Sequence, residues 1–523
     1  MIKFGVSNLR RLKDVPPLEL RPITVLVGRN SSGKSTYLRS LPLLRQSINT
    51  RTSAPILWYG DLVDFGSYET TVTENAINNT ISFTFSSDTL ESRRTWQFPE
   101  NDENRIDFKG VTYAISIVPE GFQTRIKCLK LEFQEPGLSY HIELGSDGKI
   151  GSINVNGNDI RKEISEFALV LTPGSVFPEL HVARRTSGPD RFYFPPRDDF
   201  LIDAVVIFLK QNFSSRVSDE NIANMAYRLV QMGPSTKNIL ERGRIKTGSQ
   251  QLNRFLEVLS SKDKVTMRRD FGNVLAASWF PELLNRTTAM FRAMVSNMLY
   301  IGPARARSER YYRYQELAVS EIDPDGKNFP MFLNSLSGSQ LRQLSRWIEN
   351  LFGYGLTLSR SGGHISINLD EKGAASNLVD VGYGVSQILP VLAQIWWARE
   401  RERPLWMGKN TIPTFLAIEQ PELHLHPAHQ ALLADALVGE AALRGSSSRP
   451  NKVHFLVESH SETFINRLGQ LVSQGKIKPE SVNIVVFSPD DEEERITKVQ
   501  VATFNEDGSL ENWPYGFFQA TVD

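Results

Sequence analysis

The first 45 residues alternate short apolar runs with turns. Residues 2–6 alternate between apolar and polar positions, residues 23–27 form a run rich in β-branched side chains, and residues 37–44 have apolar side chains at helical spacing. These patterns predict a strand, a buried strand and a helix, with a Gly-rich loop between the last two. This order is typical of the start of an α/β nucleotide-binding unit.

The pattern changes twice in the middle of the chain. Between residues 81 and 156 hydrophobicity alternates with period two, and turn dipeptides such as Asp147-Gly148 separate the runs. Antiparallel strands are expected there. Between residues 198 and 297 apolar residues recur three and four positions apart, which predicts mostly helix.

From residue 300 onwards strand-like runs alternate with helical ones again. The strand-like runs are 365–369, 414–418, 453–457, 482–487 and 496–504. The α/β unit that opens the chain therefore resumes after a β-rich and a helical insertion. The predicted segments are 1–70 (N-terminal part of the α/β unit), 71–160 (β-rich), 161–299 (mainly helical) and 300–523 (C-terminal part of the α/β unit).

Composition excludes several classes of protein. Of the 523 residues, 40% are hydrophobic and 23% are charged, which is typical of a globular protein and not of a disordered one. Lys and Arg number 59, and so do Asp and Glu, so no net charge favours bulk binding to nucleic acid or to an acidic membrane. The single cysteine, Cys128, fits a reducing compartment. We expect a cytoplasmic protein without a signal peptide or a membrane segment.

A phosphate-binding motif follows the second predicted strand. Residues 28–35, GRNSSGKS, match the pattern G-x-x-x-x-G-K-[ST]. In this motif the glycines let the backbone wrap a phosphate, Lys34 reaches the β- and γ-phosphates, and Ser35 offers its hydroxyl to Mg²⁺. The residues expected to bind ATP here are Gly28, Arg29, Asn30, Ser31, Ser32, Gly33, Lys34, Ser35 and Thr36.

Two later predicted strands end in acidic and polar residues. The apolar run 415–418 leads to Glu419 and Gln420. In this arrangement the acid holds Mg²⁺ and the next polar group orients the attacking water. The run 455–457 leads to a segment in which His460 is placed to contact a γ-phosphate.

Taken together, these motifs resemble the ABC-type ATPases of the SMC-like and OLD-like branch, AAA-family ATPases of prokaryotic defence and repair systems. The matching motifs are a Walker A motif at 28–35, a Walker B end at 419–420, a D-loop at 425–427, a switch-histidine segment at 459–461 and a W-P-x-G-F-F ending at 513–518. The resemblance implies an ABC-type P-loop ATPase head that is split by the insertion. It also implies ATP and Mg²⁺ as cofactors and a dimer or higher oligomer formed through the ATP sites.

One departure from the family concerns the catalytic base. Most such ATPases end the Walker B strand with Asp-Glu, whereas this chain has Glu419-Gln420. A glutamine can orient water but cannot take its proton. We therefore expect slow hydrolysis, or a base supplied by Glu422 or His460.

Two segments compete for the role of the signature loop, which completes the ATP site of a partner subunit in this family. Residues 336–340, LSGSQ, are close to the consensus but lie about 80 residues before the Walker B strand. Residues 380–387 lie only about 30 residues before it and open a predicted helix. We favour Ser386 as the serine that contacts ATP and interpret Ser337 as a helix N-cap.

Two alternative sites involve histidines and acids. Glu422, His424, His426 and His429 suggest zinc, but their spacing is not an established zinc pattern, and the D-loop interpretation is favoured. An intrinsic nuclease would need the acidic run 490–494, which lies in a turn-like cluster after a strand.

The resemblance implies an ATPase subunit of a prokaryotic antiviral system, similar to Septu-type and retron-associated ATPases, that senses or scaffolds for a separate effector such as an HNH nuclease. An SMC-like repair ATPase is one alternative, which the lack of a long heptad pattern disfavours. A non-hydrolysing module that ATP locks into an oligomer is the other. Arginines mixed with tyrosines at 305–312 suggest local contact with nucleic acid, and a solvated charged surface explains them as well.

Overall fold

The structure is a computed structural model of the chain. It describes residues 1–523 except 75, 77–78, 92–106, 162, 166, 186–191, 194–196, 213–216, 243–248, 402–411, 443–451, 490–495 and 515–523. The acidic run 490–494 and the end of the C-terminal motif at 513–518 therefore lie outside the described residues.

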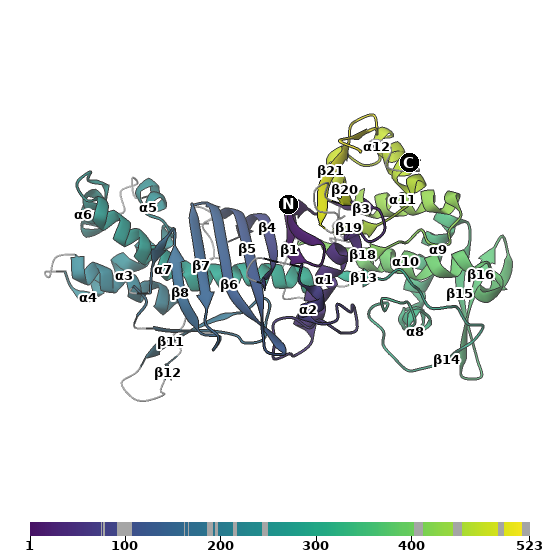
Figure 1. Ribbon diagram of the computed structural model, residues 1–523, viewed down its shortest axis with the longest axis horizontal. Helices are drawn as coiled ribbons and strands as arrows, with labels where there is room; N and C mark the ends of the chain where they lie inside the picture. The colour runs from purple at the N-terminus through teal and green to yellow at the C-terminus, as the bar shows by residue number, and fades with distance from the viewer. Residues whose placement is uncertain are drawn as a thin grey trace.

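A seven-stranded sheet with a parallel core lies to the right of the centre in Figure 1. Its strands, in spatial order, are β13 (Leu299–Ile301), β18 (Thr414–Glu419), β19 (Val453–Glu458), β3 (Ile23–Gly28), β20 (Val482–Pro489), β21 (Thr497–Phe504) and β22 (Leu510–Glu511). The first five are parallel, and β21 and β22 continue the sheet antiparallel. Every residue of β3 and β18 is buried, as the continuous apolar runs predict.

Helices cover both faces of this sheet. On one face α1 (Lys34–Asn49) packs in the same core cluster as Leu26, while Val25 and Val27 point into the cluster on the other face. The helices that contribute to that second cluster are α8 (Phe329–Ser335), α9 (Gly338–Phe352), α10 (Tyr383–Glu400), α11 (Pro427–Ala442) and α12 (Glu462–Ser473). Alternate strand residues therefore serve opposite layers, and the α/β class predicted from the sequence is confirmed.

An eight-stranded antiparallel sheet lies next to the parallel one (Figure 1). Its strands, in spatial order, are β2 (Leu12–Glu19), β1 (Ile2–Leu9), β4 (Ile81–Glu91), β5 (Asp107–Glu120), β6 (Gln123–Glu135), β7 (Leu138–Leu144), β8 (Ile150–Val155) and β9 (Asn158–Asp159). The strand predicted at residues 2–6 thus pairs with the β-rich insertion and not with β3. Burial alternates along β7, which suits a sheet with one covered face.

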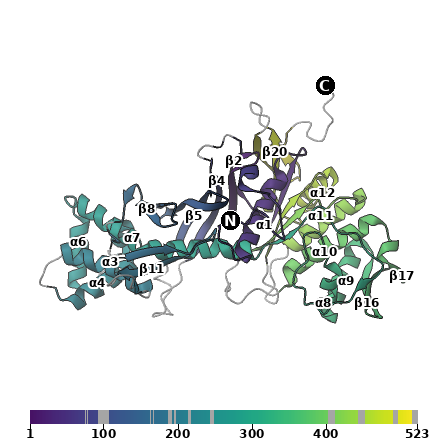
Figure 2. The ribbon, with the colours of Figure 1, turned by 60° about the horizontal axis from the view of Figure 1, so that its bottom comes forward.

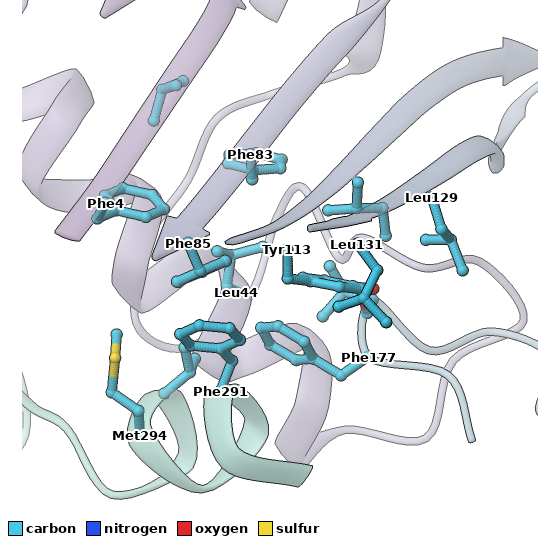
Figure 3. Packing of buried hydrophobic residues seen from close by; sticks show 14 of the residues in the cluster. Phe4, Leu44, Phe83, Phe85, Tyr113, Leu129, Leu131, Phe177, Phe291 and Met294 are labelled. Carbon is cyan, nitrogen blue, oxygen red and sulfur yellow. The ribbon is translucent and has the colours of Figure 1, made fainter. Parts of the chain in front are cut away.

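The long helix α7 (Val265–Ser296) covers this antiparallel sheet and runs along it, as Figure 2 shows. Aromatic rings fill the space between them: Phe291 of α7 lies 5.2 Å from Phe85 and 6.3 Å from Tyr113, measured between ring centroids (Figure 3). Phe177, from the loop before β11 (Leu180–Arg185), lies 5.4 Å from Phe85. The antiparallel sheet and the parallel sheet share one core, because residues of β18 and β19 belong to the same cluster.

The remaining elements are helices around the first part of α7 and a set of short helices and strands. Helices α3 (Arg197–Asn212), α4 (Asp219–Gln231), α5 (Thr236–Arg242) and α6 (Gln250–Ser260) pack around the first part of α7. The short elements are α2 (Tyr68–Thr71), β10 (Phe167–Leu171), β12 (Phe192–Tyr193), β14 (Tyr312–Arg313), β15 (Gly355–Ser361), β16 (His364–Glu371) and β17 (Ala374–Asn377). Among the described residues, no helix combines the length and the apolar character that crossing a membrane requires.

Candidate functional site

The loop between β3 and α1 has a backbone that only glycine accommodates at two positions. Gly28 has φ 155°, and a Cβ there would lie 2.3 Å from the carbonyl oxygen of Phe487. Gly33 has φ 96°, and a Cβ there would lie 2.8 Å from a methyl carbon of Leu12. Ser31 also has a positive φ, of 63°. The loop therefore curls tightly between the end of a strand and the start of a helix, as the motif at 28–35 predicts.

The polar side chains of Ser32 and Lys34 in this loop are buried. Lys34 is 3% exposed, and its Nζ donates to the carbonyl oxygens of Gly28 at 3.0 Å and Arg29 at 2.8 Å. Burial lowers the pKa of Lys34, while Glu458 and Glu422 oppose this shift. The hydroxyl of Ser32 is buried and has no hydrogen-bond partner in the part of the chain that is described. An ammonium, an unpaired hydroxyl and the N-terminus of α1 around a glycine turn fit a phosphate group.

Ser35 faces an acid that the sequence reasoning did not assign. Its Oγ donates to Oε1 of Glu458 at 2.9 Å, and Nζ of Lys34 lies 3.9 Å from the same oxygen. The side chain of Glu458 is 2% exposed, and its Oε2 has no partner among the described residues. Burial raises the pKa of Glu458, and the Ser35 hydrogen bond opposes the rise. The sequence shows Glu458 as an acid at the end of an apolar run, which is the same pattern as Glu419. That Glu458 lies beside the loop follows only from the strand order, in which β19 pairs with β3.

Glu419 accepts hydrogen bonds from two neighbouring side chains. Nε and one terminal nitrogen of Arg39 each donate to its carboxylate at 2.7 Å, and the hydroxyl of Tyr300 donates at 2.7 Å. Glu419 is 1% exposed. The hydrogen bond to Glu419 raises the pKa of Arg39, so the guanidinium stays charged. The structure places Glu419 at the end of β18 as expected, and its carboxylate hydrogen-bonds to these two side chains.

The candidate catalytic residues lie in the two loops that follow β18 and β19. Gln420 has φ 41°, and its backbone N–H donates to the carbonyl oxygen of Glu458 at 2.9 Å. Oε1 of Glu422 accepts the backbone N–H of His460 at 2.6 Å, whereas Oε2 is buried and finds no partner within the described chain. Burial raises the pKa of Glu422 and lowers that of His460, which Lys34 lowers further. The structure thus joins the Walker B loop directly to the histidine loop.

A buried arginine supports this pair of loops. Arg305 is 5% exposed and donates to the backbone carbonyl oxygens of Glu419 at 3.3 Å and Gln420 at 3.4 Å. Burial lowers the pKa of Arg305 to about 10. Because these contacts lie inside the protein, Arg305 acts as a structural residue of the site.

The two signature candidates differ in their surroundings. Ser337 caps α9. Its hydroxyl oxygen accepts a hydrogen bond from the backbone N–H of Gln340, and the side-chain oxygen of Gln340 accepts one from the backbone N–H of Ser337. The prediction of an N-cap there is confirmed. Ser386 is 6% exposed and donates to the carbonyl oxygen of Tyr383 inside α10. Its contact with the ATP of a second subunit stays a prediction.

Two of the histidines after Gln420 contact different aromatic rings. The ring of His424 lies 5.0 Å from that of Tyr383, and the ring of His429 lies 5.7 Å from that of Phe352. Within the described ranges, no group of three or more metal-binding side chains has the geometry to hold an ion. The His424, His426 and His429 group therefore gains no support as a zinc site.

Comparison with known proteins adds to this picture. Residues 252–466 match the sequence family described as "AAA domain, putative AbiEii toxin, Type IV TA system". This segment resembles an AAA domain. The AAA segment includes Glu419, Glu458 and His460, whereas the phosphate-binding loop at 28–35 precedes it. Curated protein sequences show no significant match.

Solved SMC heads match nearly the whole chain at low similarity. An Smc head bound to the C-winged helix domain of ScpA is 12% identical with a TM-score of 0.32, covering 96% of this chain and 97% of that one. An Smc head domain with an extended coiled coil, bound to the C-terminal domain of ScpA from Pyrococcus furiosus, is 12% identical with a TM-score of 0.33, covering 96% of this chain and 97% of that one. The SMC head domain from Thermotoga maritima is 8% identical with a TM-score of 0.30, covering 95% of this chain and 97% of that one. TM-scores of this size carry no argument about mechanism or partners.

Proposed function

We propose that this chain binds ATP with Mg²⁺ and hydrolyses it slowly, as the ATPase subunit of a prokaryotic antiviral system. The observation that carries the nucleotide part is the glycine turn with buried Lys34 and the unpaired hydroxyl of Ser32. Binding of a phosphate would replace the carbonyl contacts that Lys34 now makes. The loop backbone and the side chains from 28 to 36 would surround the phosphates.

The magnesium ion would sit beside Ser35. When bound, Mg²⁺ neutralises charge on the β- and γ-phosphates. Its protein ligands would be the hydroxyl of Ser35 and a buried carboxylate from a neighbouring strand, for which Glu419 is the sequence-based candidate. Oxygen ligands of this kind are those that Mg²⁺ prefers.

The residues after β18 favour slow turnover. Gln420 replaces the usual glutamate and can only orient water. Glu422 lies two residues after Gln420, and its buried Oε2 without a described partner makes it the candidate general base. Burial raises the pKa of Glu422, which strengthens it as a base once it is deprotonated. His460 is the candidate contact for the γ-phosphate.

The biological role rests on similarity. The family matched by the AAA segment includes AbiEii-type toxins by its description, which supports a defence role for this chain. In the proposed arrangement ATP closes a dimer in which Ser386 of one copy completes the site of the other. A separate effector, such as an HNH nuclease, would attack the invading genome or the host, and this chain would sense or scaffold for it.

Steady-state phosphate release tests this function. Wild type should show slow, Mg²⁺-dependent turnover, while Lys34→Ala should show none. Gln420→Glu should raise turnover, and Glu422→Gln should lower it by about 10²–10⁴-fold if Glu422 is the base. Full turnover in Lys34→Ala would refute ATP hydrolysis at this loop, and strong stimulation by duplex DNA would favour the repair alternative.

The second candidate function is a lock in which ATP holds an oligomer together without turnover. Gln420 is the observation that favours it, because the usual proton acceptor is missing. Sedimentation with ATP distinguishes the two candidates when it is combined with the phosphate assay. Nucleotide-dependent oligomers with no phosphate release, and turnover only in Gln420→Glu, would indicate the lock.

A further inference from the structure

Two buried carboxylates end adjacent strands near the phosphate-binding loop, and they differ in what they contact. Within the described part of the chain, Glu419 accepts three hydrogen bonds from Arg39 and Tyr300, whereas the side chain of Glu458 accepts one, from Ser35. We propose that Glu458, and not the Walker B acid Glu419, is the carboxylate that holds Mg²⁺ together with Ser35. This inference rests on the proposed function, because it concerns the ion that accompanies ATP.

The distance between Ser35 and Glu458 suits two ligands of one ion. Mg²⁺ binds oxygens at about 2.1 Å in a near-octahedral arrangement, which separates neighbouring ligand oxygens by about 3 Å. Oγ of Ser35 and Oε1 of Glu458 are 2.9 Å apart. The two oxygens therefore already stand at the spacing of adjacent octahedral ligands.

The other oxygen of Glu458 also points to a cation. Oε2 is buried without a hydrogen-bond partner in the described chain, and such a charged group is costly unless something compensates it. Lys34 lies 3.9 Å from the other oxygen, Oε1, and donates to two backbone carbonyls instead. A divalent ion beside Ser35 would satisfy the carboxylate without moving Lys34 away from the phosphates.

Glu419 would have to give up strong bonds to do the same. Its carboxylate is bound through both oxygens to the guanidinium of Arg39, at 2.7 Å each, and accepts the hydroxyl of Tyr300 as well. Charge-assisted pairs of this two-point kind are among the strongest in proteins. Arg39 lies four residues after Ser35 on α1, so this pair ties the helix to β18.

Strand order explains why the nearer acid is Glu458. β19 is hydrogen-bonded to β3, with Glu458 in register with Leu26, two residues before Gly28. β18 is one strand further out, with Glu419 in register with Glu458. Adjacent strands are about 4.8 Å apart, so Glu419 begins one strand spacing further from the loop.

The test measures how Mg²⁺ changes nucleotide affinity, not turnover. A fluorescent ATP analogue is titrated in excess Mg²⁺ and in EDTA. The Kd in EDTA divided by the Kd in Mg²⁺, here called the Mg²⁺ ratio, is compared among variants. Glu458→Gln keeps the shape and should reduce this ratio about tenfold or more. Its Kd in EDTA should stay the same or tighten, because a buried negative charge near the phosphates is removed; this value also shows that the variant is folded.

Glu419→Gln is the matched control, because it makes the same change one strand away. It should keep the wild-type Mg²⁺ ratio. Ser35→Ala should reduce the ratio as Glu458→Gln does, and the double variant should lose little more, since the two side chains act on one ion.

The assignment would be overturned if Glu419→Gln reduced the Mg²⁺ ratio while Glu458→Gln did not, or if both variants reduced it equally. An unchanged Mg²⁺ ratio in Glu458→Gln would overturn it as well. A wild-type protein that binds no nucleotide in either condition would instead refute the proposed function.

Discussion

Arg39 compensates the buried charge of Glu419, and removing it gives a sharp prediction. In Arg39→Met the side chain of Glu419, which is 2% exposed, keeps one donor among the described residues, the hydroxyl of Tyr300. Breaking a buried ion pair by removing one partner costs about 3–5 kcal/mol. Because the side chain of Arg39 is 32% exposed, we expect about 2–3 kcal/mol here.

The assay is thermal unfolding followed by intrinsic tryptophan fluorescence. For units of this size 1 kcal/mol corresponds to about 2–4 °C, so the transition of the unit that contains α1 and β18 should fall by roughly 4–12 °C. Glu419→Gln in the same background removes the charge that Arg39 compensates. The double variant Arg39→Met/Glu419→Gln should therefore recover at least half of the loss.

Two results would refute this reasoning. An unchanged transition in Arg39→Met would mean that solvent or another group compensates Glu419. A double variant that is no more stable than Arg39→Met would mean that the arginine stabilises the protein through packing and not through its charge.

Three further predictions concern stability and the start of α10. Burial lowers the pKa of His454 to about 4, so the unfolded chain takes up its proton near pH 6.5 while the folded protein does not. The stability that neutral His454 contributes is present above pH 6.5 and is lost as the pH falls towards 4. Over this window in urea unfolding, the free energy of unfolding of wild type should fall by about 2 kcal/mol more than that of His454→Gln. Parallel pH profiles of the two proteins would contradict this prediction. In α12 a Cβ on Gly469 would lie 2.4 Å from a backbone oxygen, whereas Gly439 in α11 has open space. Gly469→Ala should therefore lower the melting temperature. Gly439→Ala should leave it unchanged or raise it, with a gain of up to about 1 kcal/mol in the free energy of unfolding. Equal effects of the two substitutions would be inconsistent with the packing described. A Cβ on Gly384 would lie 2.4 Å from a backbone oxygen of the loop after β18, while Gly382 has open space. The dimer that we propose ATP to close should therefore fail to form in sedimentation for Gly384→Ala only. The opposite ranking would count against a role for the start of α10 in this dimer.

Much of the fold could be predicted because its signals are local. The loop at 28–35 needs glycine at fixed spacing, and the structure gives Gly28 and Gly33 the positive φ values that the motif requires. Continuous apolar runs such as those of β18 and β19 are typical of buried parallel strands, and the structure places both runs in the parallel sheet. Each of these features depends on a few neighbouring residues.

The rest depends on which strands become neighbours. The sequence shows two acids at strand ends, but nothing local shows that Glu458 lies beside Ser35 or that Glu419 pairs with Arg39. Both contacts join residues about 380–420 positions apart, across an insertion that also takes β1 into its own sheet. Long-range pairing of this kind is decided by packing of whole layers.

Calorimetric titration with Mg²⁺-ATP tests the central claim most directly. Wild type should bind about one nucleotide per chain, and Lys34→Ala, which removes the buried ammonium from the loop, should bind at least about 100-fold more weakly or not at all. Equal binding by both proteins, or no binding by the folded wild type, would contradict the account.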